Sequence, residues 1–281
     1  MSPDPMHPNP MHPALRIAAE AARAAFEEAR ASHSREALAE YVADGADGTP
    51  TMLIDMLVEP AILAALERAG PDGRVNVLSE EAGHIDRGAA VTLVMDPVDG
   101  SANAAAGVPL CAFSGALAVD GAFTEAVTVW LDTGRSWWAA RGRETPLRTS
   151  GRRELAGAAV SLLRPRTDLP GAWAAWRAVA GRAGRIRVLS TSCLEAALVA
   201  EGAVDAFADA ASDTHRLVDV AAAVVLAEAA GGAVRDVHGR PIEPCTDLTR
   251  RWSAVVGATP ELAEELAATL RGAAEAAAGT G

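Results

Sequence analysis

Hydrophobic and polar residues alternate along the chain with two periods, one typical of helices and one typical of strands. The helical period predicts helices over residues 14–31, 51–70, 171–182, 192–202, 217–230 and 261–278. Short apolar runs bounded by turn residues predict strands over residues 75–78, 91–95, 112–119, 123–130, 136–140, 158–163, 185–189, 205–208, 232–237 and 254–257. Strands are grouped first and alternate with helices later, which predicts an α/β fold with an α+β N-terminal half.

A basic, polar connection over residues 142–153 separates these two patterns. We therefore expect an α+β half at about 14–145 and an α/β half at about 146–281. Residues 1–13 are rich in proline and lack the basic and apolar regions of a signal peptide, so they are predicted to form a disordered leader.

The strongest chemical signal follows the strand predicted at 91–95. There the chain reads Asp96-Pro97-Val98-Asp99-Gly100-Ser101. Two carboxylates held on one bend are able to converge on a hard cation, and the backbone N–H groups after a glycine are able to bind a phosphate. Asp-Pro and Asp-Gly are also ordinary turn dipeptides, so this run alone fits a plain turn equally well.

Further acids elsewhere in the chain favour the cation site. Glu80 lies one loop and one strand before Asp96, while Asp55 and Asp219 fall near the starts of predicted helices. Asp219 considered alone could simply be a helix N-cap. With Asp96 and Asp99, however, these acids would bring about five negative charges together, which a folded site holds only with cations.

Four separated segments carry a resemblance to a known family: residues 45–51 leading to Asp55 and Glu59, residues 79–81, residues 96–103, and the helix with Asp219 that ends in Gly231-Gly232. The chain resembles the inositol monophosphatase superfamily of magnesium-dependent phosphatases, in particular its archaeal-type inositol monophosphatase and fructose-1,6-bisphosphatase branch. The resemblance implies a layered αβαβα sandwich, two or three Mg²⁺ ions per site with Mn²⁺ as a possible substitute, and commonly a homodimer.

The resemblance also implies a role for each matching residue. Glu80, Asp96 and the Val98 carbonyl would hold the first metal, and Asp96, Asp99 and Asp219 the second, with a third ion near Glu80. Asp55, Ser101 and Glu80 would be catalytic, the first two orienting and deprotonating a metal-activated water. The phosphate and substrate would contact Asp99, Gly100, Ser101, Ala102, Asp209 and Asp219, with Asp213 as a competitor of Asp209. A covalent role for the Ser101 hydroxyl is the rival mechanism.

Two departures from the family pattern are visible. The usual threonine is replaced by Ser101, which keeps the hydroxyl, and the next position is Ala102, which loses a second one.

His215 and Arg216 precede Asp219, and we interpret them as part of a solvated loop in preference to substrate contacts.

Composition excludes several classes of function. The net charge of −12 argues against binding to nucleic-acid polymers, and the complete absence of lysine excludes Schiff-base, pyridoxal and P-loop chemistry. The cysteines Cys111, Cys193 and Cys245 are too widely spaced to suggest a disulfide framework, so a cytoplasmic location is expected, and no run is long enough to span a membrane.

We therefore expect a Mg²⁺-dependent phosphomonoesterase acting on a small phosphorylated polyol or sugar. Inositol monophosphate-like and fructose 1,6-bisphosphate-like compounds are the leading substrates, followed by a nucleotide or a secondary-metabolite phosphate. The alternative is a catalytically idle homologue that binds a metal or a phosphorylated metabolite and acts through assembly.

Overall fold

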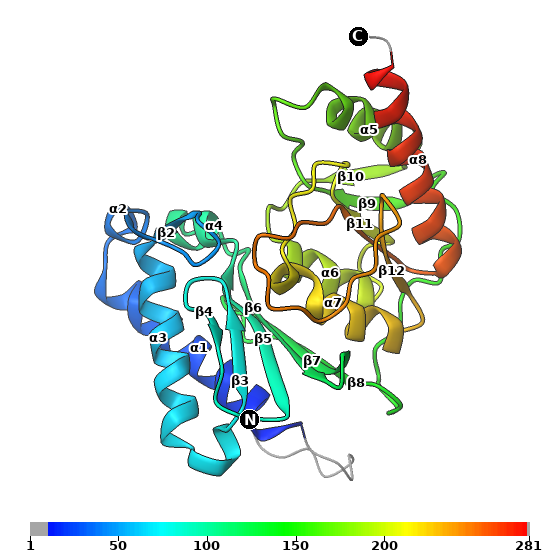
Figure 1. Ribbon diagram of the computed structural model, residues 1–281. Coiled ribbons are helices and arrows are strands. Elements are labelled where there is room, and N and C mark those ends of the chain that lie inside the picture. Colours follow the sequence, from blue (N-terminus) through cyan, green and yellow to red (C-terminus); the bar gives the residue numbers. More distant parts are fainter. Residues whose placement is uncertain (1–10, 280–281) are drawn as a thin grey trace.

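The computed structural model describes residues 11–279 and shows five alternating layers of helices and sheets (Figure 1). From one side to the other, the layers are the helices α1 (Pro13–Ser32) and α3 (Leu53–Arg68), a six-stranded sheet, the helices α6 (Ser192–Ala200) and α7 (Leu217–Ala229), a five-stranded sheet, and the helices α5 (Pro170–Ala180) and α8 (Pro260–Ala278). This arrangement confirms the predicted αβαβα sandwich.

The six-stranded sheet has the order β4-β3-β5-β6-β7-β8. Its strands are β3 (Asn76–Ser79), β4 (Gly83–Ile85), β5 (Val91–Asp99), β6 (Ala112–Val119), β7 (Ala122–Trp130) and β8 (Ser136–Ala140). Strands β3 and β5 are parallel, with Ser79 opposite Met95, whereas the other neighbours are antiparallel. The carboxyl ends of β3 and β5 therefore meet at one edge of the sheet.

The five-stranded sheet has the order β10-β9-β11-β13-β12. Its strands are β9 (Ala159–Leu162), β10 (Arg185–Arg187), β11 (Ala206–Ala208), β12 (Ala233–Asp236) and β13 (Ala254–Gly257). Helix α7 packs against both sheets, and its residues 217–227 are all buried. This double burial explains why the helix is apolar on every side.

Several short elements were not predicted. They are α2 (Arg35–Leu38), the hairpin of β1 (Tyr41–Asp44) and β2 (Pro50–Met52), the 3-10 helix η1 (Gly70–Gly73), the strand β4, and α4 (Ser101–Ala106). These elements are short, and none of them contains a run of large apolar residues. The hairpin is important for the site because its turn crosses towards α7.

The predicted leader falls mainly on residues 1–10, which lie outside the described residues. Its last three residues belong to the folded part, which corrects the predicted boundary. Pro13 is the first residue of α1, and the His12 ring accepts the Ala14 N–H at 3.2 Å. The backbone N–H of His12 donates to Glu125 at 2.7 Å. Proline suits this helix start because its missing N–H needs no partner there.

Among the helices of residues 11–279, none combines the length and the apolar character required to cross a membrane.

Burial along α6 predicts how much stability is lost when its leucines are shortened to alanine. Leu194 of α6 is fully buried, and Leu194→Ala is expected to lower the free energy of unfolding by about 2–5 kcal/mol because the cavity cannot close completely. Leu198 on the same helix is only partly buried, so Leu198→Ala should cost less. Urea denaturation of both variants measures the difference, and equal losses would contradict this packing.

Candidate active site

A bulge at the end of β5 brings two predicted site residues together. Asp96 lies opposite Ser114 of β6 and Asp99 lies opposite Ala112, so β5 has one extra residue between them. Residues three apart in a regular strand point to opposite faces, and the extra residue removes that separation. Ligand atoms of Asp96, Asp99 and Cys193 all lie within 4.8 Å of one another. The sequence predicted a sharp turn after Met95, whereas the strand continues through the bulge to Asp99.

Glu80 lies next to this bulge because β3 ends beside β5. The segment that carries it is held by Glu59 of α3, whose carboxylate accepts the Ser79 hydroxyl at 2.6 Å and the Ala82 N–H at 2.7 Å. Glu59 is itself buried. A buried acid of one layer therefore positions an acid of the next.

The N-terminus of α6 fixes the Asp99 carboxylate. It accepts the backbone N–H groups of Ser192 at 3.0 Å and Cys193 at 2.9 Å, together with the Thr191 hydroxyl. Unpaired N–H groups at a helix start favour a negative charge. Asp99 is thus oriented by a segment more than 90 residues away in sequence.

Cys193 lies among these carboxylates, which the sequence did not predict. Its side chain is buried, and burial together with Asp99 raises the pKa of the thiol well above its usual range. The thiol remains protonated and is a weak ligand. Its Sγ lies 3.4 Å from the Asp219 carbonyl oxygen, to which it donates. The ionisable ligands of the site are therefore still carboxylates, which suit a hard cation.

Ser101 and Asp55 are hydrogen-bonded across two elements. The Ser101 Oγ lies 2.7 Å from Asp55 Oδ1, in the first turn of α3, and 2.9 Å from the Val98 carbonyl oxygen. Gly100 precedes α4 with a φ of 85°, and a Cβ there would lie 2.9 Å from the Leu110 oxygen. Glycine is therefore required at this position.

The structure gives Arg216 a different place from the one predicted. Its side chain is only 16% exposed, and the guanidinium contacts Glu80, Asp219 and Asp47, the last from the turn between β1 and β2. Asp219 also accepts the Arg216 backbone N–H at 2.6 Å, as in a capping box. The expected solvated loop is wrong here, because three acids from three segments surround this one cation.

His215 is also buried, with 1% of its surface exposed. Its Nδ1 accepts the Ala254 N–H at 3.2 Å, which leaves Nε2 as the protonated nitrogen, and Nε2 has no hydrogen-bond partner among the described residues. The only signal in the sequence for either residue was its proximity to Asp219.

Burial dominates the ionisation of these acids. It raises the pKa of Asp55 to about 7, that of Glu80 to about 8 and that of Asp99 to about 6. The pKa of Asp96 rises well above its usual value through burial and then through the charge of Glu80. Burial also opposes ionisation of Asp219, but the charge and hydrogen bonds of Arg216 outweigh it and lower that pKa. Of these acids, Glu80, Asp96, Asp99 and Asp219 lie together with a single arginine, an arrangement that favours divalent metal ions.

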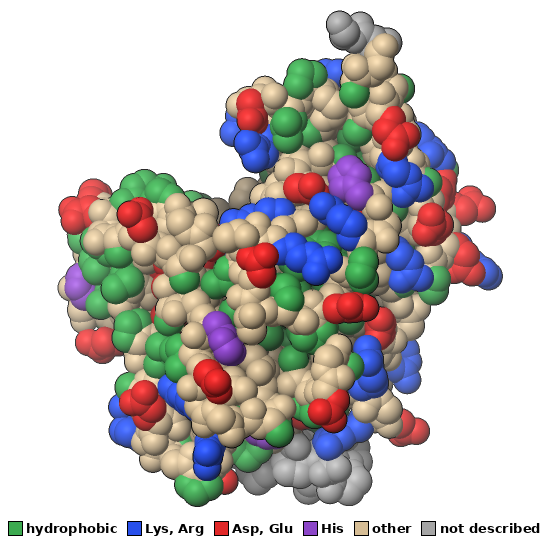
Figure 2. Space-filling view, viewed as in Figure 1, with side chains coloured by type: hydrophobic (Ala, Val, Ile, Leu, Met, Phe, Trp, Pro, Cys, Tyr) green, Lys and Arg blue, Asp and Glu red, His purple; other side chains and the backbone are tan. Residues whose placement is uncertain are grey.

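A pocket of about 450 Å³ opens beside the acids. It is lined by Asp47, Thr49, Asp99, Leu163, Arg164, Ser190, Ser192, Thr214, His215, Arg216, Asp219 and Arg251. The outline of the molecule is hollowed between the part with α2 and α4 and the part with α5 and β10 (Figure 2). Three arginines and three aspartates line the pocket, so its wall carries charges of both signs.

Neither candidate for the substrate-hydroxyl contact lines this pocket. Asp209 is 1% exposed and accepts the Ser212 and Thr214 N–H groups at 3.3 and 3.0 Å. Asp213 pairs with Arg240 and accepts the Ser253 hydroxyl. Both carboxylates shape the loop before α7, whereas Thr214, His215 and Arg216 form the wall.

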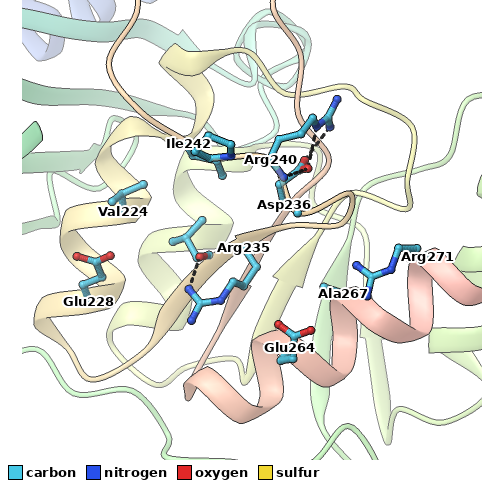
Figure 3. A pocket seen from close by; sticks show the side chains of 12 residues that line it. Val224, Glu228, Arg235, Asp236, Arg240, Ile242, Glu264, Ala267 and Arg271 are labelled. Carbon is cyan, nitrogen blue, oxygen red and sulfur yellow. Dashed lines mark hydrogen bonds and ion pairs between the residues drawn. The ribbon is translucent and has the colours of Figure 1, made fainter. Parts of the chain in front are cut away.

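A second pocket of about 290 Å³ lies between α7, β12 and α8 (Figure 3). Arginines and acids are mixed there, and Arg240 is paired with Asp236. Among the described residues, its lining includes none of the predicted site residues. The chemistry is therefore expected at the first pocket.

Comparison with known proteins agrees with this geometry. The model of the inositol monophosphatase family matches residues 11–275. A Methanothermobacter thermautotrophicus protein named fructose-1,6-bisphosphatase/inositol-1-monophosphatase is 32% identical over 250 residues, which cover 82% of this chain and 87% of that protein. Nus factor SuhB of Pseudomonas aeruginosa is 33% identical over 199 residues, 66% of this chain and 72% of that protein.

The same fold is seen in the crystal structure of extragenic suppressor protein suhB from Bartonella henselae. The TM-score is 0.77, with 24% identity, over 92% of this chain and 97% of that chain.

The raised pKa values predict how stability depends on pH and metal. Without metal, folded Asp55, Glu80 and Asp99 keep protons up to about pH 7, 8 and 6, whereas the unfolded chain loses them near 3.8 to 4.5. The folded state thus binds more protons in this window, so stability falls as pH rises through it. Thermal unfolding in EDTA should show a lower Tm at pH 8 than at pH 6.

Mg²⁺ should reverse this trend. It competes with protons for the same carboxylates, so the rise in Tm on adding Mg²⁺ should be larger at pH 8 than at pH 6. Asp96→Asn serves as the control and should respond less. An equal response of the unmodified protein at both pH values would count against a shared carboxylate site.

Proposed function

The chain belongs to the inositol monophosphatase family, and from this membership we propose that it hydrolyses the phosphomonoester of a small phosphorylated polyol or sugar with the help of Mg²⁺. It is a phosphatase of the inositol monophosphatase and fructose-1,6-bisphosphatase type. The observation that carries the proposal is the bulge of β5, which gathers Asp96 and Asp99 beside Glu80 while Ser101 bonds to Asp55.

The carboxylates and one carbonyl would hold the metal. Glu80, Asp96 and the Val98 carbonyl would bind one ion, and Asp96, Asp99 and Asp219 a second. Bound Mg²⁺ would stabilise the negative charge of the phosphate and of the leaving oxygen. Mn²⁺ has similar ligand preferences and could substitute.

Ser101 and Asp55 would move the proton. When the Ser101 hydroxyl donates to Asp55, its oxygen would be able to accept a hydrogen bond, and then a proton, from a water molecule. Burial raises the pKa of Asp55 to about 7, close to the value that suits a general base near neutral pH. The proton would pass from water through Ser101 to Asp55, and the water oxygen would attack phosphorus.

The phosphate would lie at the start of α4. The N–H groups of Gly100, Ser101 and Ala102 belong to the turn and first residues of this helix, where donors lack intrahelical partners. Arg164, Arg216 and Arg251 on the pocket wall would attract the anionic substrate. The remaining proposals are a cytoplasmic homodimer and no nucleic-acid or membrane partner.

The choice of a sugar or polyol rests on relatives such as the M. thermautotrophicus protein, whose name includes both activities. A second candidate is an idle homologue that works through assembly, since one similar protein is named a Nus factor. A cluster of buried carboxylates joined to a Ser–Asp pair favours the enzyme, because assembly does not require it.

A substrate panel tests the class of reaction. Phosphate release from inositol, sugar, nucleotide and histidinol phosphates is expected for one or a few compounds, with strict dependence on Mg²⁺ and loss in EDTA. Folded, metal-loaded protein without turnover of any compound would favour the idle homologue.

Proton transfer through Ser101 is tested by substitution. Ser101→Ala and Asp55→Asn should each lower kcat by about 10²–10⁴-fold, the usual contribution of a general acid–base group, with unchanged folding by circular dichroism. Asp72→Asn, which removes an exposed carboxylate, is the matched control and should keep full activity. A Ser101→Ala enzyme with the activity of the parent would exclude this proton path.

A further inference from the structure

Arg216 contacts acids that the proposed function assigns to two different metal ions. Its guanidinium bonds to Glu80, proposed for the first metal, and to Asp219 Oδ1 at 2.9 Å, proposed for the second. A third contact joins it to Asp47 Oδ2 at 3.2 Å. One side chain therefore spans the space that the two cations would share.

Asp219 is largely occupied by this arginine. Its Oδ2 accepts the Arg216 backbone N–H at 2.6 Å and the Nε at 3.2 Å, and its Oδ1 accepts Nη2. A carboxylate oxygen accepts about two bonds, so Oδ2 has no free lone pair. Asp219 could accept the backbone N–H and still bind a metal ion. A metal ion on this carboxylate would, however, be repelled by the positive charge of the Arg216 guanidinium.

We propose that Arg216 is a built-in cation that occupies the Glu80 and Asp219 carboxylates in the metal-free protein and competes with divalent ions for them. This inference rests on the proposed function, since it takes Glu80 and Asp219 as metal ligands. Arg216 stabilises the metal-free fold and lowers the affinity for metal, because each incoming ion must displace its contacts.

A neighbouring arginine provides a matched control. Arg251 also donates to Asp47 Oδ2, at 3.2 Å, and also lines the pocket, but within residues 11–279 it pairs with Asp47 and with backbone carbonyls, not with Glu80 or Asp219. Arg216→Gln and Arg251→Gln each remove one positive charge from the same carboxylate. Only the first removes a competitor from the proposed metal ligands.

Binding of Mn²⁺ to the metal-stripped full chain tests the competition. The electron paramagnetic resonance signal of free Mn²⁺ gives a dissociation constant without requiring turnover. Arg216→Gln should lower this constant by about tenfold, a typical coupling between two linked events, and Arg251→Gln should leave it unchanged. In EDTA, Arg216→Gln should also lower Tm, and Mn²⁺ should raise its Tm by more than it does for the parent.

The outcomes separate this inference from the proposed function. Equal or weaker Mn²⁺ binding by Arg216→Gln, or the same tightening by Arg251→Gln, overturns the competition and leaves the metal-dependent phosphatase intact. If neither the parent nor Arg216→Gln binds Mn²⁺, the metal site fails and both proposals fall.

If Arg216→Gln does not fold, Arg216→Lys tests the competition with Mn²⁺ in its place, because it keeps the positive charge. A single ammonium lacks the planar fork that reaches several carboxylates at once. Tighter Mn²⁺ binding than in the parent supports the competition, and unchanged affinity counts against it.

Discussion

Four acidic side chains lie near one another between the six-stranded sheet and the central helices: Asp96, Asp99 and Asp219 are buried, and Glu80 is 18% exposed. The surrounding structure must offset their mutual repulsion. The sheet brings the first three together through the parallel pair of β3 and β5 and the bulge. Asp219 reaches them only because α7 begins there. The site is therefore assembled from several layers, because no single element brings these four like charges together.

Much of the fold could be predicted from the sequence because its longer elements have clear periods. Helix α7 was expected over 217–230 and is seen at Leu217–Ala229, while β6 and β8 have the expected bounds. The hairpin of β1 and β2 could not be predicted, since both strands are short and β1 is exposed along its whole length. Its turn nevertheless carries Asp47, whose side chain is fully buried by arginines from distant segments.

The acids of the site could be proposed from local motifs, but their partners could not. Arg216 contacts Glu80 across 136 residues, and Cys193 reaches Asp99 across 94. Such contacts depend on how the layers stack, which no local period describes. Asp209, an acid at a strand end, was expected to contact substrate. Its carboxylate accepts N–H groups of its own loop, a local role that the strand pattern does not indicate.

The two central helices offset the acids in different ways. Helix α6 points its free N–H groups at Asp99, so the partial positive charge of its N-terminus acts on an acid from another layer. Helix α7 carries Asp219 in its own first turn and holds Arg216 beside it. Together these devices supply roughly one full positive charge and a fraction of another against four acids. The remaining charge must come from protons or from cations bound from solution, so ionisation, metal binding and stability of this layer are one coupled equilibrium.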